Sequence, residues 1–331
     1  MHRNGKIPDA DPILSIKDLE VWFHTRENIV HAVNSVSMQV SRGEILGVVG
    51  ESGCGKSVTM MSILGLLPSP PAEIRSGEAL LEGKNLLAMR PDELRMIRGR
   101  KIGFIFQDPM TSLNPVLSVG FQLREPLRTH LGMSKKAANA RAAELLDMVG
   151  IPAAAKRLSD FPHQFSGGMR QRVMIAMALA CDPAVLIADE PTTALDVTIQ
   201  AQILELLGEL QQCLGMAIIW ITHDLGVIAG LADNVLVMYA GQIVERAPVE
   251  ALFDSPAHPY TKALLRTVPT VRGDRREKLQ TISGQAPTLV SKPDFCPFMP
   301  RCEQAFDLCS KRVPPRIVHG ESRDSACFLG Q

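Results

Sequence analysis

The segment with the most specific chemistry is residues 50–57, GESGCGKS, which fit the pattern G-x-x-x-x-G-K-[ST]. The preceding residues 44–50 predict a strand, and the following residues predict a helix, which is the context this pattern requires. Backbone N–H groups in such a loop surround phosphate oxygens. We expect this segment to bind the phosphates of a nucleotide through Ser52, Gly53, Cys54, Gly55, Lys56, Ser57 and Val58.

Two side chains of this segment have separate expected tasks. Lys56 should reach the β- and γ-phosphate oxygens, because its ammonium group is the cation nearest to them. Ser57 should coordinate Mg²⁺ through its hydroxyl. Cys54 lies at a position where the pattern accepts any residue, so its thiol is incidental to the pattern.

A second group of polar residues follows other predicted strands. Residues 184–190, AVLIADE, form an apolar run that ends in two carboxylates. Asp189 is expected to hold Mg²⁺, and Glu190 to polarise a water molecule that attacks the phosphate. Since ligands of open α/β sheets gather at the carboxyl ends of strands, these residues belong to the same chemistry.

Gln107 and His223 also end predicted strands, at residues 101–107 and 216–224. The amide of Gln107 can contact both Mg²⁺ and the attacking water, and a polar turn residue is the alternative. A single histidine is more often structural than catalytic, but the strand end favours a catalytic role for His223.

Residues 165–172, FSGGMRQR, resemble a second phosphate-binding segment. A hydroxyl and two glycines precede an apolar-periodic stretch that predicts a helix. The N-terminus of a helix presents unpaired N–H groups and the positive end of its dipole to an anion. The chain therefore carries two such segments for what looks like one nucleotide.

The order of these motifs, with TALD at 193–196, resembles the ATPase subunit of an ATP-binding-cassette (ABC) transporter over about residues 14–250. The resemblance places Phe23 against adenine, although a buried strand aromatic is the alternative. In this family two ATPase subunits pair head to tail, and each signature segment completes its partner's nucleotide site. The resemblance implies that the signature residues contact the ATP of the partner subunit; these residues are Ser166, Gly167, Gly168 and Met169. It also implies that Asp196 lies at the same interface between the two subunits.

Further stretches resemble the branch of this family that imports dipeptides, oligopeptides and nickel. Phe165 matches a variant of the signature common there, while Phe165 and Met169 replace the leucine and glutamine of many members. The other stretches are FQDPMTSLNP at 106–115, HPYTKALL at 258–265 and CPFMPRCEQAFDLC at 296–309.

The resemblance implies the ATP-hydrolysing subunit of a bacterial peptide importer, on the cytoplasmic face of the inner membrane. Its expected partners are a second ATPase subunit, two transmembrane permeases and an extracytoplasmic solute-binding protein, without nucleic acid. Its expected cofactors are ATP and Mg²⁺.

The last third of the chain contains a separate group of cysteines, spaced C-x5-C-x6-C-x17-C. Such a group favours metal binding over disulfides in a cytosolic protein. The spacing lacks the close pairs of zinc sites and matches neither common ferredoxin pattern. Similar tails in peptide-importer ATPases include some with a [4Fe–4S] cluster. We expect such a cluster, with zinc or reduced thiols as alternatives, at Cys296, Cys302, Cys309 and Cys327.

The positioning elements alternate between strand and helix, which predicts an α/β fold with a mainly parallel sheet. The resemblance specifies a P-loop ABC-ATPase fold: a RecA-like α/β core, an antiparallel β subdomain and a helical subdomain. Residues 134–150 and the apolar stripe between 198 and 212 predict helices. We expect an ATPase domain at 1–265, its helical subdomain at about 108–180, and an extension at 266–331 with a boundary near 271–280.

The composition excludes several classes. The 331 residues include 35 basic and 35 acidic side chains, so no net charge attracts the chain to nucleic acid or anionic lipid. No apolar run approaches the roughly 20 residues of a membrane helix, and the polar start lacks a signal core. Two alternatives stay open: another cargo such as nickel, and a non-transport ABC ATPase acting on nucleic acid or ribosomes.

Overall fold

The computed structural model describes residues 12–108, 112–193, 195–268, 281–320 and 322–330. The chain divides into two compact units. Unit 1 comprises residues 1–41, 45–88 and 221–331, and unit 2 comprises residues 42–44 and 89–220. The polar first residues and the expected boundary segment 271–280 lie outside the described residues.

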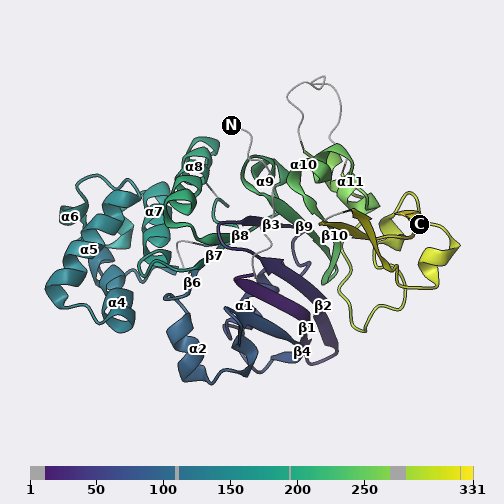
Figure 1. Ribbon diagram of the computed structural model, residues 1–331, viewed down its shortest axis with the longest axis horizontal. Helices are drawn as coiled ribbons and strands as arrows, with labels where there is room; N and C mark the ends of the chain where they lie inside the picture. Colours follow the sequence, from purple (N-terminus) through teal and green to yellow (C-terminus); the bar gives the residue numbers. More distant parts are fainter. Residues whose placement is uncertain (1–11, 109–111, 194, 269–280, 321, 331) are drawn as a thin grey trace. The chain divides into compact units, whose positions relative to one another are not determined.

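Unit 1 contains an antiparallel sheet with the strand order β2-β1-β4-β5. Its long strands pair along most of their length, and in β1 the buried Leu19 and Val21 alternate with the half-buried Glu20 and Trp22. Helix α1 packs on this sheet (Figure 1). The elements are β1 (Leu14–His24), β2 (Ile29–Val40), β4 (Ala72–Leu81), β5 (Lys84–Asn85), η1 (Leu86–Ala88) and α1 (Lys56–Ile63).

A second run of neighbouring strands in unit 1 has the order β11-β12-β10-β9-β3. Strand β3 is buried throughout and runs parallel to β9, while the other pairs are antiparallel. The strands are β3 (Ile45–Val49), β9 (Asn234–Tyr239), β10 (Gln242–Pro248), β11 (Arg316–Gly320) and β12 (Arg323–Ala326). Strands of the expected C-terminal extension thus belong to the same unit as the strand before the phosphate loop, and the boundary at residue 266 stays a prediction.

Short helices complete unit 1, and α11 begins within the HPYTKALL stretch. These helices are α9 (Leu225–Leu231), α10 (Val249–Asp254), α11 (Pro259–Arg266), η3 (Met299–Arg301), η4 (Asp307–Ser310) and η5 (Phe328–Gly330).

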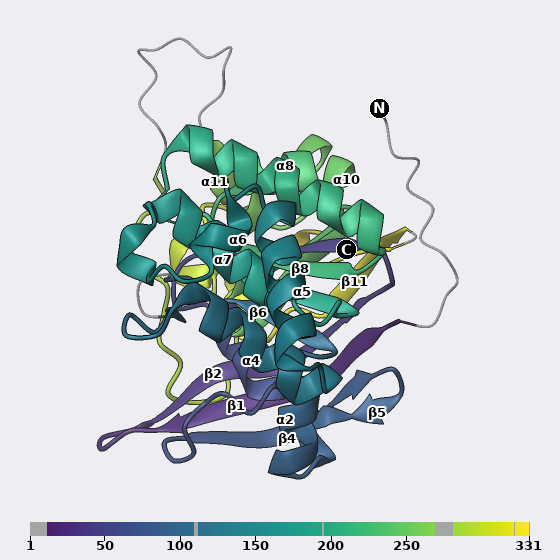
Figure 2. The ribbon, with the colours of Figure 1, turned by 90° about the vertical axis from the view of Figure 1, so that its left-hand side faces the viewer.

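Unit 2 combines parallel strands with a group of helices. Strand β6 runs parallel to β7, and the strand order is β8-β7-β6. The described part of residues 108–180 contains helices and no strand, and Figure 2 shows α4, α5, α6 and α7 gathered together. The predicted helices at 134–150 and 198–212 are confirmed as α5 and α8.

In unit 2, β6, β7, β8, α5, α7 and α8 lie close to the positions that the sequence predicts. The elements of the unit are α2 (Pro91–Ile97), β6 (Ile102–Ile105), α4 (Val119–Leu131), α5 (Lys135–Met148), α6 (Ala154–Arg157), η2 (Pro162–Gln164), α7 (Gly167–Ala178), β7 (Val185–Asp189), α8 (Val197–Leu214) and β8 (Ala217–Thr222), whose last two residues fall in unit 1.

A buried polar joint connects β10 to the start of α11 within unit 1. The carboxylate of Glu245, which is fully buried, accepts hydrogen bonds from the backbone N–H groups of Ala257 and His258 at 2.7 and 2.8 Å. Nδ1 of His258 in turn accepts the backbone N–H of Tyr260 at 3.0 Å and caps α11. The pKa of His258 is lowered to about 3, mainly by burial; a hydrogen bond with the backbone of Ala326 acts in the opposite direction, and the charge of Lys262 makes a smaller lowering contribution.

This joint predicts a pH-dependent stability. Because the folded-state pKa of His258 lies below its ordinary value of 6.5, unfolded chains bind more protons between these values. The stability that neutral His258 contributes to the folded chain is therefore fully present above pH 6.5 and is lost as the pH falls. The free energy of unfolding decreases by at most about 1.4 kcal/mol per pH unit.

We expect His258→Asn to reduce this dependence, because asparagine can cap a helix but does not titrate. Urea unfolding of both proteins at pH 7.5, 6.5 and 5.5 measures the effect. Equal pH dependence in the two proteins would contradict the assignment.

Candidate nucleotide-binding site

The phosphate loop lies between β3 and α1, where the sequence predicts it. Gly55, the residue before α1, has a φ of 100°, and a Cβ there would lie 2.6 Å from the carbonyl oxygen of Ala32. Gly53 also has a positive φ, of 79°. Glycine is required at Gly55 because any larger residue would clash with backbone and adopt a disfavoured conformation.

Lys56 lies deep in this loop, with 5% of the residue exposed. Its Nζ donates to the carbonyl oxygens of Gly50 and Glu51 at 2.7 and 3.0 Å, and lies 3.7 Å from Sγ of Cys54. The Cys54 thiol is buried, and burial raises its pKa, so the thiol fills space as an uncharged group. The other expected contacts differ in exposure: Ser52 and Gly53 are exposed, while Ser57 and Val58 are half-buried.

The C-terminal part of unit 1 holds the loop from outside, which sequence reasoning missed. The backbone N–H of Glu51 donates to Oη of Tyr260 at 2.9 Å. The carboxylate of Glu51 accepts two hydrogen bonds from Arg301, at 2.6 and 2.8 Å. A tyrosine in the HPYTKALL stretch was the available signal, but no local pattern shows that its hydroxyl reaches residue 51.

Two other predicted site residues lie in unit 1. Phe23 is half-buried near the end of β1, in register with Val30 and Ala72. His223 is exposed just after β8 and precedes Asp224, whose carboxylate caps α9. Their roles toward adenine and in catalysis stay predictions.

In unit 2, two predicted catalytic side chains meet at the carboxyl ends of parallel strands. Nε2 of Gln107 donates to Oε2 of Glu190 at 3.1 Å, and Oγ1 of Thr193 donates to the same oxygen at 2.9 Å. Asp189, the last residue of β7, is 5% exposed. Because β6 and β7 are parallel and in register, their polar end residues fall at one edge.

Glu190 adopts a left-handed backbone conformation, with a φ of 46°. Such a conformation costs free energy for a residue with a side chain and persists only where surrounding contacts fix it. The backbone N–H of Thr193 donates to the Glu190 carbonyl at 3.1 Å, so Thr193 bonds both the main chain and the side chain of Glu190. The sequence analysis includes Thr193 in the TALD motif but assigns it no contact with Glu190.

The signature segment forms the start of α7 in unit 2. Ser166 is the N-cap and accepts the N–H of Met169 at 3.3 Å, and Phe165 is buried with 3% exposed. Ser166 and Gly167 are exposed, whereas Gly168 and Met169 are half-buried. The sequence-based prediction of a helix N-terminus here is confirmed.

Asp196 caps the neighbouring helix α8 by accepting the N–H of Ile199 at 3.0 Å. The Ile199 side chain packs so closely that a Cβ on Gly168 would lie 2.9 Å from its Cγ2. A Cβ on Gly167 would meet no atom within 4 Å. Close packing against Ile199 therefore excludes a side chain at Gly168, whereas no contact in the described part of the chain excludes one at Gly167.

The expected metal centre at the four cysteines is not supported. Cys296, Cys302, Cys309 and Cys327 all line one hollow of about 20 Å³. Among the described residues, however, no group of three or more histidine, cysteine or acidic side chains is placed to hold a metal ion. Burial raises the pKa of Cys296 to about 11 and also raises the pKa values of Cys302 and Cys327. The expectation of an iron–sulfur cluster or zinc at these cysteines therefore stays unsupported.

Family comparisons agree with the motifs. Residues 33–193 match the family model described as ABC transporter. Residues 244–309 match the model described as the C-terminal region of oligopeptide/dipeptide transporters. The second match includes Tyr260 and Arg301, the two residues that contact the phosphate loop from outside.

Curated relatives match almost the whole chain. A putative peptide import ATP-binding protein of Brucella ovis is 50% identical over 331 residues, covering 97% of this chain and 98% of the relative. The oligopeptide transport ATP-binding protein OppD of Bacillus subtilis is 52% identical, covering 92% and 85%. The dipeptide transport ATP-binding protein DppD of the same organism is 50% identical, covering 96% and 95%.

Solved structures show the same fold. A dimeric structure of the ATP-binding cassette MJ0796 bound to ADP and Pi has a TM-score of 0.64 and 30% identity, and the match covers 71% of this chain and 98% of that one. Within the described residues, no helix has both the length and the apolar character to cross a membrane. The fold, the phosphate loop and the relatives lead to one conclusion: the chain belongs to the ATP-binding subunits of ABC transporters, in the oligopeptide and dipeptide transporter branch.

Proposed function

We propose that this chain hydrolyses ATP to power the uptake of dipeptides or oligopeptides through separate membrane proteins. The observation that carries this proposal is the near-complete match to peptide import ATP-binding proteins at about half identity. The phosphate loop, whose conformation requires glycine at Gly55, and the Gln107–Glu190 pair supply the residues that ATP hydrolysis needs.

In the proposed mechanism, the phosphate loop binds ATP through its backbone N–H groups and Lys56. The Lys56 ammonium already lies among oxygen acceptors, so phosphate oxygens offer it ligands of the same kind with more charge. Mg²⁺, when bound, neutralises charge on the phosphates, and Ser57, Asp189 and Gln107 are the proposed ligands. Phe23 is proposed to stack on the adenine.

Glu190 is the proposed base that orients and polarises the attacking water. Its carboxylate is fixed by Gln107 and Thr193, which reduces the rearrangement needed before reaction. His223 is proposed to stabilise the charge that develops on the transferred phosphate. Catalysis of this kind is mainly positioning and electrostatic stabilisation.

The signature segment is proposed to act on the ATP of a second ATPase subunit. Ser166 and Gly167 are exposed at a helix N-terminus, which favours a contact with an anion outside the chain. The similar cassette solved with ADP and Pi is dimeric, which supports the pairing. Gly168, Met169 and Asp196 are proposed to line the same interface.

The remaining partners follow from the proposed cargo. Two transmembrane permeases would form the pore, and a solute-binding protein would deliver the peptide. The chain would then lie at the cytoplasmic membrane face as a peripheral subunit.

Peptide uptake tests the proposed cargo directly. Cells lacking the gene for this chain are expected to lose uptake of a radiolabelled tripeptide or dipeptide and to regain it with the wild-type gene. A Lys56→Ala gene should not restore uptake, because the phosphate contact is lost. Unchanged peptide uptake together with lost nickel uptake would replace the proposed cargo with nickel.

Glu190→Gln should keep ATP binding and slow ATP hydrolysis by on the order of 10²–10⁴-fold, because an amide is not a general base. Glu209→Gln, on an exposed part of α8, is the matched control and should hydrolyse ATP like the wild type. Phosphate release from the purified subunits measures both. Normal turnover of Glu190→Gln would remove this residue from the mechanism.

Gly167→Ala tests the signature segment without disturbing the chain itself. We expect unchanged thermal stability and unchanged ATP affinity of the single subunit, since the added Cβ meets no atom of the described chain. ATP turnover should fall on the order of 10²-fold if this helix N-terminus contacts a partner's phosphate. Gly208→Ala, in α8, is the control for a glycine-to-alanine change, because a Cβ at Gly208 also meets no atom within 4 Å. Wild-type turnover in Gly167→Ala would argue against the shared site.

A further inference from the structure

Glu51, the second residue of the phosphate loop, is bonded through three of its groups. Its backbone N–H donates to Tyr260, and its carbonyl oxygen accepts a hydrogen bond from Lys56. Its carboxylate forms an ion pair with Arg301 through both guanidinium NH₂ groups. One loop residue therefore connects the phosphate-binding lysine to a residue 250 positions later in the chain.

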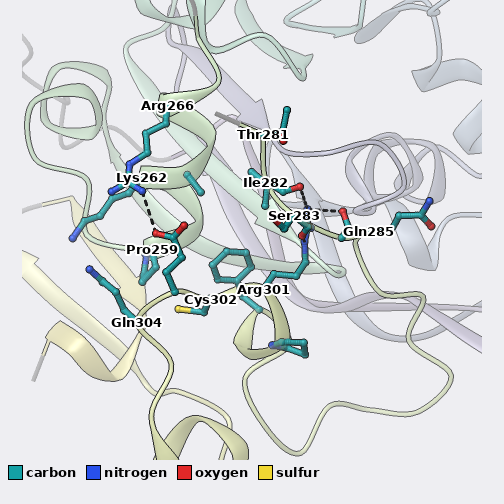
Figure 3. Close-up of a pocket in the computed structure, with 15 residues that line it drawn as sticks. Pro259, Lys262, Arg266, Thr281, Ile282, Ser283, Gln285, Arg301, Cys302 and Gln304 are labelled. Carbon is teal, nitrogen blue, oxygen red and sulfur yellow. Dashed lines mark hydrogen bonds and ion pairs between the residues drawn. The ribbon is translucent and has the colours of Figure 1, made fainter. Parts of the chain in front are cut away.

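The Arg301 side chain is buried and makes further hydrogen bonds besides those to Glu51. Its side chain is only 5% exposed, and besides Glu51 it donates to the carbonyl oxygens of Ser283 and Gly284 at 2.8 and 3.2 Å. Figure 3 shows Arg301 directed toward this backbone segment. The hydrogen bonds with Glu51 raise the pKa of Arg301, so the guanidinium stays charged. A planar guanidinium with this many partners has one orientation.

A buried aromatic cluster anchors the segment that carries Arg301. The ring of Phe298, three residues earlier, lies 5.2 Å from the ring of Tyr239 and 5.3 Å from that of Tyr260, edge-on to both. Tyr239 and Tyr260 are themselves 4.6 Å apart, and the Arg301 guanidinium lies 5.8 Å from the Tyr239 ring. The backbone of η3 is thereby fixed to the core that also positions the Tyr260 hydroxyl.

We infer that Arg301 is a positioning residue for ATP binding: through Glu51 it fixes the phosphate loop in the form that presents Lys56. This inference rests on the proposed function, because it assigns a task to Arg301 only if the loop binds ATP. The C-terminal region thus contributes to nucleotide affinity without touching the nucleotide.

Loss of Arg301 removes both charged hydrogen bonds of the Glu51 carboxylate and leaves the loop held from outside by Tyr260. The loop then samples more conformations, and ATP binding must select the competent one, which lowers the apparent affinity. We expect Arg301→Met to weaken ATP binding on the order of 10-fold. The KM for ATP should rise by a similar factor while kcat stays within about twofold, because the variant alters binding rather than the reacting groups.

The test uses the full chain and a fluorescent ATP analogue. Dissociation constants are measured for the wild type, Glu51→Gln, Arg301→Met and the double variant. Because Arg301 acts through Glu51, the effects of the two substitutions on affinity should be non-additive. The double variant should bind the ATP analogue no more weakly than the single variant that has the lower affinity. Arg301→Lys should restore affinity only in part, because lysine keeps the charge but lacks the two-pronged geometry.

Arg266→Met is the matched control. It removes an arginine–carboxylate contact with Glu303 at 3.3 Å in the same region, with both side chains largely exposed and neither touching the loop. Its ATP affinity should equal that of the wild type. Thermal melting identifies any variant that fails to fold, and Glu51→Gln carries the test if Arg301→Met does fail.

Wild-type affinity in folded Glu51→Gln and Arg301→Met would overturn the inference. Additive effects in the double variant would also overturn it, because Arg301 would then act by another route. A wild-type chain that does not bind ATP would instead refute the proposed function, so the two failures are distinguishable.

Discussion

The phosphate loop depends on placing one cation where little water reaches it. The ammonium of Lys56 is almost fully buried, and a buried charge is costly unless polar groups surround it. Here the carbonyl oxygens of Gly50 and Glu51 supply that compensation, and their positions are fixed in turn by contacts from outside the loop. The position of Lys56 therefore depends on the conformation of the loop, and that conformation depends on the contacts with Tyr260 and Arg301.

The carboxylate of Glu190, the proposed base, is organised on a similar principle in unit 2. Glu190 combines a disfavoured backbone conformation with two side-chain hydrogen bonds to one oxygen. The bond from Gln107 also connects Glu190 to the segment that leads into the helical region.

The C-terminal region contacts the phosphate loop, which the cysteine spacing does not suggest. Those thiols line a small hollow, and burial raises the pKa of Cys296, Cys302 and Cys327. The neighbouring Arg301 and Tyr260, a member of the aromatic cluster, contact the phosphate loop. Neutral thiols in such a place contribute packing, as small apolar side chains do. The buried Glu245 and His258 fix the start of α11 and hence the Tyr260 hydroxyl.

The sequence by itself determined several elements of the fold and the position of the phosphate loop. Short apolar runs ending in polar residues located β3, β6, β7 and β8, and glycine spacing located the phosphate loop, because these signals are local. Tertiary structure alone decided which distant side chains meet. The Glu51–Arg301 pair and the Tyr260 hydroxyl bond join residues more than 200 positions apart, and Thr193 reaches Glu190 only through a particular turn. Cysteine spacing alone does not specify a metal site, since metal binding requires a geometry of donor atoms that sequence separation does not fix.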